Sequence, residues 1–503
     1  MATALSLRQN APVMGQAQVR VRVVLGIATA ILVLVALINV TSPPAVGVLI
    51  ALAALTPWII ASPIRGLQVL LAAAIAIELD PLGFPDSLTD RVPFFTNLDN
   101  SLGLSGISVT PAELLMVLIL VLAFTRAEPA VRARLVNGRL FRPYLLFLLA
   151  VLMGEIHGLL NGGDLLKSLW EVRPQLYGFV AFVAASLLIR SRQDIVWIAA
   201  VAVAAILLKG AIGDFRYFVV LSRNLGTHEA VLGHEDSFFL ALMPMGALAA
   251  FIWQGWSPNL KLFALACPVP LVALLVNQRR AGIGAMVIGV GVVILLAIRF
   301  NAAHRRRLLI FALIGSAIAI AFLITFWNDQ YGVIGQLVRP IRSQIDPTYR
   351  DYLSNLYRQA ENVNLQISFQ TNKLIGMGFG MPFLVVVTQA DISTFYPLWN
   401  YIPHNTLFWV GVRMGLVGSV AFWGLIGIAL LEVCRSQSVQ KDRFVLTVVA
   451  LAGGAIAAEL LVAYADLQLE SYRNMIFMGV LFGVLNVIPA LFPEPAVEAR
   501  RFV

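Results

Sequence analysis

The sequence predicts an all-α protein that crosses a membrane many times. The chain has 503 residues, of which 59% are hydrophobic and 13% charged, and its mean hydropathy of +0.84 lies outside the range of soluble proteins. Long apolar runs recur from one end of the chain to the other. Its two cysteines indicate neither a disulfide framework nor a cysteine metal site. The net charge of +9 is expected on cytoplasmic loops and does not indicate a nucleic-acid partner.

The apolar runs give the number of membrane spans. A helix rises about 1.5 Å per residue, so roughly 20 apolar residues cross the hydrocarbon core. We predict about 14 transmembrane helices, in a range of about 12–14 because the third run is short. The runs lie at residues 23–40, 46–62, 67–79, 112–125, 144–160, 175–189, 195–212, 237–254, 262–276, 282–298, 308–326, 406–433, 444–465 and 474–492.

Basic residues between the runs predict the orientation, because cytoplasmic loops carry an excess of Lys and Arg. Residues 1–22 are polar and basic and are predicted to form a cytoplasmic tail, as is the C-terminal tail 493–503. Every second run then ends in basic residues on the same side, which predicts an N-in, C-in topology. These residues are Arg65, Arg126, Arg132, Arg134, Arg139, Arg142, Arg190, Arg192, Lys261, Arg299, Arg305, Arg306, Arg307, Arg435, Lys441, Arg443, Arg500 and Arg501.

The segments between the tails divide into four parts. Residues 23–194 hold the N-terminal helices, 195–326 the central helices and 406–492 the C-terminal helices, and 327–405 form a large extracytoplasmic loop. Loops this long usually carry function. Within the loop, Tyr349, Leu353, Leu356 and Tyr357 have helical spacing, so we expect one or two amphipathic helices lying over the outer face.

Arginines at the predicted outer ends of the helices break the usual charge rule. If these ends converge, they form a cationic site that suits phosphate, because a guanidinium bonds two oxygens at once and keeps its charge. Each arginine alone has another reading, in which it caps a helix, pairs with an acid or contacts lipid headgroups. The candidates for pyrophosphate binding are Arg216, Arg223, Arg279, Arg280, Arg350, Arg358 and Arg413, with Arg173 as a further substrate-binding candidate.

Three shorter motifs qualify this interpretation. Arg279 and Arg280 open a run rich in small residues, where the helix dipole favours an anion. The glycines of "LIGMGFG" (374–380) indicate a tight loop or a close backbone approach and not a dinucleotide site, since no parallel sheet surrounds them. His234, Glu235 and Asp236 match no standard zinc spacing, so no metal site is predicted and a polar loop re-entering the membrane is preferred.

The order of these motifs resembles a known family. The sequence His404-Asn405-Thr406-Leu407, with Gly415 eleven positions after the histidine, is similar to the signature of bacterial O-antigen ligases and related polysaccharide polymerases. The arginine and small residues at 280–282 and the "LIGMGFG" stretch resemble two further elements of that family. "LGHEDSFFLALMPM" (232–245) departs from the family's pattern. The resemblance runs from about residue 195 to 435.

The resemblance implies a GT-C-like membrane glycosyltransferase of the bacterial cytoplasmic membrane, with its active site facing the outside. Such an enzyme moves glycan from an undecaprenyl-pyrophosphate donor and needs no cofactor or metal. His404 would be catalytic or position the acceptor hydroxyl, since histidine titrates in a suitable range. Arg280 would hold the leaving pyrophosphate. Asn405 and Tyr357 are further substrate-binding candidates.

Several functions stay open at this point. The acceptor is a lipid-linked repeat in a polymerase, which we slightly favour, or a lipid A core or another terminal acceptor in a ligase; a protein acceptor is a third variant. A flippase or exporter of polyprenyl-linked sugar is the alternative of another class, and it needs charges along a central path, where Lys209 and Glu459 are the clearest examples. Expected partners are membrane lipids and, for a polymerase or ligase, a chain-length regulator or a flippase.

Overall fold

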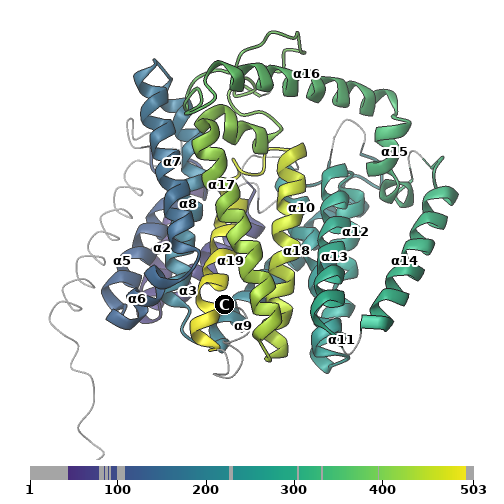
Figure 1. The fold of residues 1–503 in the computed structure, drawn as a ribbon, viewed down its shortest axis with the longest axis horizontal. Coiled ribbons are helices and arrows are strands. Elements are labelled where there is room, and N and C mark those ends of the chain that lie inside the picture. The colour runs from purple at the N-terminus through teal and green to yellow at the C-terminus, as the bar shows by residue number, and fades with distance from the viewer. Residues whose placement is uncertain are drawn as a thin grey trace, which may run out of the picture.

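The computed structural model describes residues 43–78, 84, 89, 92–98, 108–225, 230–302, 305–329, 332–394 and 396–493. Within these ranges the protein is all-helical and contains no strand. The predicted first span, the N-terminal tail and all but the first residue of the C-terminal tail lie outside the described residues. Figure 1 shows long helices standing side by side, with one helix lying across their upper ends.

The helices follow the predicted apolar runs. The N-terminal group comprises α2 Pro43–Ala61, α3 Ile64–Ala76, α5 Pro111–Arg126, α6 Pro129–Asn137, α7 Phe141–Leu160, α8 Leu165–Leu188 and α9 Arg192–Phe215. The central group comprises α10 His234–Gln254, α11 Pro258–Ala266, α12 Pro268–Val276, α13 Arg280–Phe300 and α14 Arg305–Thr325. The remaining helices are α15 Arg339–Ile345, α16 Tyr349–Thr371, α17 Thr406–Val439, α18 Arg443–Ala465 and α19 Tyr472–Leu491.

The described residues contain nine helices long and apolar enough to span a membrane, or ten if the bent pair α5–α6 counts as one span. A polytopic membrane protein is therefore confirmed, whereas about fourteen spans are not. The shortfall has a physical cause in α3, which has 13 residues and thus a length of about 20 Å, too short to cross a bilayer. The apolar run 262–276 is likewise divided between the short helices α11 and α12.

Polar residues at the helix starts explain where several helices begin. Thr110 and Glu113 form a reciprocal capping box at α5, and Ser191 and Asp194 form another at α9. Asp164 accepts two backbone N–H bonds at the start of α8. These caps satisfy N–H groups that a helix leaves without partners in its first turn.

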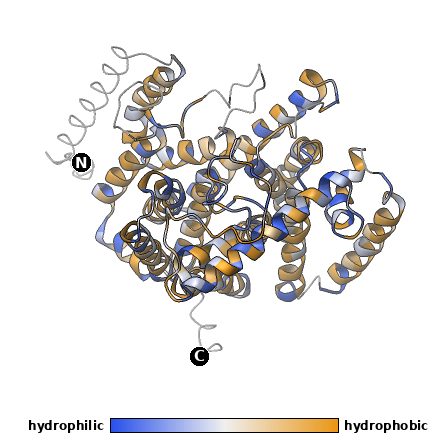
Figure 2. Cartoon of the chain, turned by 90° about the horizontal axis from the view of Figure 1, so that it is seen from above, coloured by the Kyte–Doolittle hydropathy of each residue, from blue (hydrophilic) through white to orange (hydrophobic). Residues whose placement is uncertain are grey.

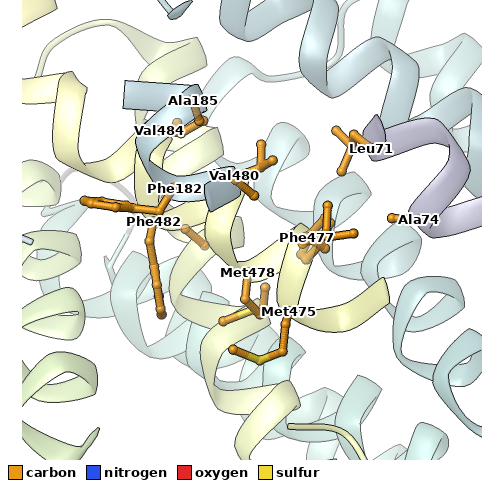
Figure 3. Close-up of a cluster of buried hydrophobic side chains, with 14 of the residues drawn as sticks. Leu71, Ala74, Phe182, Ala185, Met475, Phe477, Met478, Val480, Phe482 and Val484 are labelled. Carbon is orange, nitrogen blue, oxygen red and sulfur yellow. The ribbon is translucent and has the colours of Figure 1, made fainter. Parts of the chain in front are cut away.

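The core is built around α19, which packs most extensively on α8 and also contacts α3. Figure 3 shows apolar side chains of these three helices interlocking, among them Leu71 of α3, Phe182 of α8 and Phe477 of α19. Small residues let the backbones approach closely: a Cβ at Gly479 would lie 2.1 Å from the Gly178 carbonyl oxygen. Helices surrounded by lipid gain no hydrophobic stabilisation from association, so close backbone packing of this kind holds them together.

Helix α17 is broken near its start by Gly415, whose φ of 61° and ψ of −155° are not helical. The break frees the carbonyls of Val412 and Arg413, which accept hydrogen bonds from the N–H groups of Met377 and Gly378. A Cβ at Gly415 would lie 2.4 Å from the Leu374 backbone, so a side chain has no room here. The glycine-rich stretch is thus a tight segment that approaches the backbone of α17.

The long segment 327–405 contains the two expected helices, α15 and α16, and α16 lies across the ends of the bundle (Figure 1). Figure 2 shows α16 from above, with hydrophilic and hydrophobic residues alternating along it. Its predicted stripe is turned away from the bundle, since Tyr349, Leu353 and Leu356 are exposed. The loops after α13 and α17, which carry many of the basic residues, lie at the opposite end (Figure 1).

Cysteine labelling tests the predicted orientation. In a Cys267→Ala/Cys434→Ala background, Thr388→Cys places a thiol at an exposed position of the long segment, and Ala133→Cys places one on α6 at the other end. An impermeant thiol reagent should label Thr388→Cys in intact spheroplasts and Ala133→Cys only after lysis. The reverse pattern would invert the topology.

Candidate functional site

A cavity of about 230 Å³ lies between α16, the segment before α17 and the end of α18. It is strongly polar: its lining includes His404, Arg358, Glu361, Asn355 and Asn405. These residues come from stretches far apart in the sequence, so the cavity exists only because α16 lies over the ends of α17 and α18.

His404 lies at one wall of this cavity, immediately before α17. The helix is capped by Asn405, whose side chain accepts the N–H of Phe408, so His404 is not its own helix cap. The Glu361 carboxylate accepts the backbone N–H of His404 at 2.9 Å and lies 3.1 Å from its Nδ1. With a proton on Nδ1, Nε2 keeps its lone pair and is free to accept a proton from a ligand.

The surroundings of Glu361 and His404 fix the pair in place. The Glu361 side chain is buried, while that of His404 is 22% exposed and reaches the cavity. Tyr357, one helical turn before Glu361, packs its ring edge-to-face on the imidazole at 5.6 Å between centroids. A buried carboxylate that holds one imidazole nitrogen is the arrangement that orients a general base.

Arginines cluster beside the cavity, near the start of α13. Arg280 donates to Asn355, a cavity residue, at 3.0 Å and to Ser354 at 3.2 Å. Arg339 forms an ion pair with Asp351 at 2.8 Å, and Arg350 and Arg358 lie close enough to Arg280 for their charges to interact. Burial alone would raise the pKa of Asp351, but the bonds and charges of Arg339 and Arg280 hold it below its usual value. Four guanidinium groups thus lie together with the Asp351 carboxylate beside the cavity.

A second histidine–carboxylate pair lies next to the first. His234 Nδ1 is 2.6 Å from the Asp466 carboxylate, which follows the cavity residues Tyr464 and Ala465. Burial alone would raise the pKa of Asp466, but the bond with His234 and the positive charge of Arg358 hold it well below its usual value. Within the part of the chain that the structure describes, no three His, Cys, Asp or Glu residues form a metal-binding group. The motif at 234–236 instead begins α10 and supplies His234 to this pair.

The structure brings some of the predicted site residues together and not others. His404, Asn405 and Arg358 meet at the cavity, and Tyr357 packs on His404. Arg280 and Arg350 lie beside the cavity, and Arg279 is the neighbour of Arg280 in the chain. Arg223 lies in an exposed turn with a φ of 68°. Arg173 bonds to Asn97 and to the Ser108 carbonyl, where it anchors the segment before α5.

Arg216 and Arg413 are fully buried and serve the fold. Arg216 bonds both oxygens of Glu78, at 2.7 and 3.1 Å. Arg413 forms an ion pair with Glu171 at 2.5 Å and donates to the carbonyls of Gly378, Met381 and Tyr401. Neither guanidinium reaches the cavity lining. Arg413, which the sequence places within the apolar helix after His404, is therefore a structural residue.

Comparison with known proteins gives no identification. Neither a protein-family model nor a curated protein sequence matches this chain. The residues of the cavity therefore carry the functional assignment. Glu361 of the cavity and Asp466 beside it were missed in the sequence, although Glu361 is one turn from Tyr357 on the same helical face, which is a usable signal.

The Glu171–Arg413 pair can be tested by stability. Arg413→Met should destabilise the protein by about 3–5 kcal/mol, because it leaves Glu171 as an uncompensated buried charge. Adding Glu171→Gln should recover part of this loss, since the amide is neutral and still accepts a hydrogen bond. Thermal unfolding of the purified variants in detergent measures both effects. Wild-type stability of Arg413→Met would contradict the structural role.

Proposed function

We propose that the protein is a membrane glycosyltransferase that moves glycan from an undecaprenyl-pyrophosphate donor to an acceptor hydroxyl on the extracytoplasmic face. The observation that supports this proposal best is the position of His404. Its Nδ1 contacts the buried Glu361 carboxylate, and its side chain reaches a cavity that Arg358 also lines. Arg280 and its neighbouring arginines lie beside that cavity. This reaction requires a base for the acceptor hydroxyl and, next to it, cations for the leaving phosphate.

The proposed reaction is a substitution at the anomeric carbon of the donor sugar. The acceptor oxygen forms a bond to that carbon while the bond from the carbon to the pyrophosphate oxygen breaks. The acceptor proton passes to Nε2 of His404, and Glu361 stabilises the resulting imidazolium. Arg280 and Arg358 stabilise the charge that collects on the leaving polyprenyl pyrophosphate. No step requires a metal.

The proposal places the enzyme in a bacterial cytoplasmic membrane, N-in and C-in, with a GT-C-like fold. A lipid-linked donor suits a cavity at the outer ends of the helices, where nucleotide sugars are absent. Within this function we favour a polysaccharide polymerase, whose acceptor is another lipid-linked repeat. A ligase acting on a lipid A core or another terminal acceptor uses the same chemistry at the donor.

The flippase alternative has less support. A flippase needs charges along a path through the membrane, and Lys209 and Glu459 were its clearest candidates. Lys209 is fully buried and pairs with Glu78 at 2.7 Å and with Asp236 at 3.3 Å. Glu459 is also buried and accepts hydrogen bonds from Asn474. Both charges are engaged between helices, which favours the enzyme.

Substitution of the histidine–carboxylate pair tests the proposed chemistry. With purified protein, lipid-linked oligosaccharide and EDTA, His404→Ala should lower turnover by roughly 10²–10⁴-fold, the usual range for losing a positioned base. Glu361→Gln should cause a smaller loss of kcat with an unchanged donor KM, because it disturbs the imidazole and not the donor site. The measurement is glycan transfer together with release of polyprenyl pyrophosphate.

Two results would contradict this assignment. Normal transfer by His404→Ala would remove the histidine from the chemistry. Loss of wild-type transfer in EDTA, with recovery on adding Mg²⁺, would show that the arginines do not suffice for the leaving group. Thermal unfolding of each variant separates loss of chemistry from loss of fold.

Substitution of Arg280 tests donor binding separately. Arg280→Ala should weaken binding of a non-cleavable donor analogue by about 1.5–3 kcal/mol, the contribution of a charge-assisted hydrogen bond. Arg280→Lys should recover only part, because a point charge does not replace a two-pronged guanidinium. Lys373→Ala removes an exposed cation of the segment 327–405 and serves as the control. Its donor affinity is expected to be unchanged. Equal losses in the two alanine variants would indicate a general charge effect.

A further inference from the structure

A larger cavity, of about 840 Å³, lies at the other end of the bundle. It is enclosed by the last turns of α10, α13 and α17 and by the first turns of α14 and α18. Since α17 begins at the His404 cavity and ends here, the two cavities lie at opposite ends of a long helix (Figure 1). By the charge rule this end is the cytoplasmic one.

The lining of this cavity carries three cations that no acid among the described residues pairs with. Arg307, Lys441 and Arg443 line it and are exposed, and none of them forms a hydrogen bond or ion pair through its side chain with another described residue. The nearest acid in the sequence, Asp442, is already engaged: one oxygen accepts from Arg192 at 3.0 Å, and the other caps α18. Three free cations at one opening favour an anion with several oxygens, such as a phosphate.

The rest of the lining is apolar and aromatic. Phe251, Trp253, Phe300, Leu308 and Phe311 contribute from three helices. A free phosphate leaves this part of the wall without a partner, whereas the glycerol and acyl chains of a phospholipid cover it. A cavity of this size also falls within the range of small-molecule sites.

The position of α14 adds a second, independent indication. None of its residues is buried, and in Figure 1 it leans away from α13 towards α15. Its first turns line the cavity, so a chain leaving the cavity along α14 meets the exposed apolar side chains of this helix. Acyl chains match such a face because its side chains are apolar.

We propose that this cavity binds an anionic glycerophospholipid of the membrane leaflet at this end. The phosphate is held by Arg307, Lys441 and Arg443, and the acyl chains run along the exposed apolar side chains of α14. The lipid completes the packing of α14, the one described span without a buried residue of its own. This site is separate from the His404 cavity and does not depend on the proposed glycosyltransferase activity.

Lipid binding to the purified full-length protein tests the proposal. The probe is a short-chain phosphatidylglycerol, followed by native mass spectrometry and thermal unfolding, with the matching phosphatidylcholine and glycerol 3-phosphate as comparisons. The wild type should bind phosphatidylglycerol saturably and gain thermal stability, and the other two probes should do neither. Each cation removed should cost about fivefold in affinity, so Arg307→Gln/Lys441→Gln/Arg443→Gln should lose on the order of 100-fold.

The controls keep the outcome decisive. Arg132→Gln/Arg142→Gln/Arg306→Gln removes the same number of exposed cations at this end without touching the cavity and should bind like the wild type. If the triple cavity variant does not fold, Lys441→Gln alone should still show the fivefold loss. Equal affinity of the cavity and control variants would overturn the proposal. Glycerol 3-phosphate binding as tightly as the lipid would show an anion site that needs no membrane lipid.

Discussion

The buried ion pair between Glu171 and Arg413 is the interaction on which the half of the structure around the His404 cavity depends. Both side chains are fully buried. An unpaired charge in such a buried site costs several kcal/mol. Their remaining partners include Trp409, Gly380 and the carbonyl of Tyr401. The pair thereby joins α8, the glycine-rich segment and the broken start of α17. Tyr401 precedes His404 by three residues, so the position of the proposed base follows from how these charges are satisfied.

The cost of burying a charge also divides the arginines of this protein into a buried, bonded group and a partly exposed group. Arg473 donates to the carbonyls of Ala74 and Ile75 at the end of the short helix α3, where Lys209 and Glu78 also pair. A helix that stops inside a membrane exposes carbonyls that must be bonded, and the cations meet that need. These residues are buried and bonded within the fold. Arginines that remain partly exposed, such as Arg280 and Arg358, are the ones able to hold a phosphate.

Much of the fold was predictable because it depends on local sequence. Hydropathy located the helices, and helical spacing located α16 in the long segment. The histidine and Arg280 were found from short motifs. Pairings across the fold were not predictable: Glu361 lies 43 residues from His404, and the burial of Arg413 depends on α8 and the glycine-rich segment meeting it. The described residues confirm nine long spans and not fourteen, and the third predicted run is a 13-residue helix whose apolar composition is that of a longer span.

The most direct test of the central claim is an electron cryomicroscopy map of the protein with a non-cleavable lipid-linked donor bound. The account predicts the pyrophosphate within hydrogen-bonding distance of Arg358 and Arg280, with the first sugar ring facing Nε2 of His404. It also predicts that Glu361 remains on Nδ1 in the complex. Donor density elsewhere in the protein, with the cavity at His404 unfilled, would contradict it.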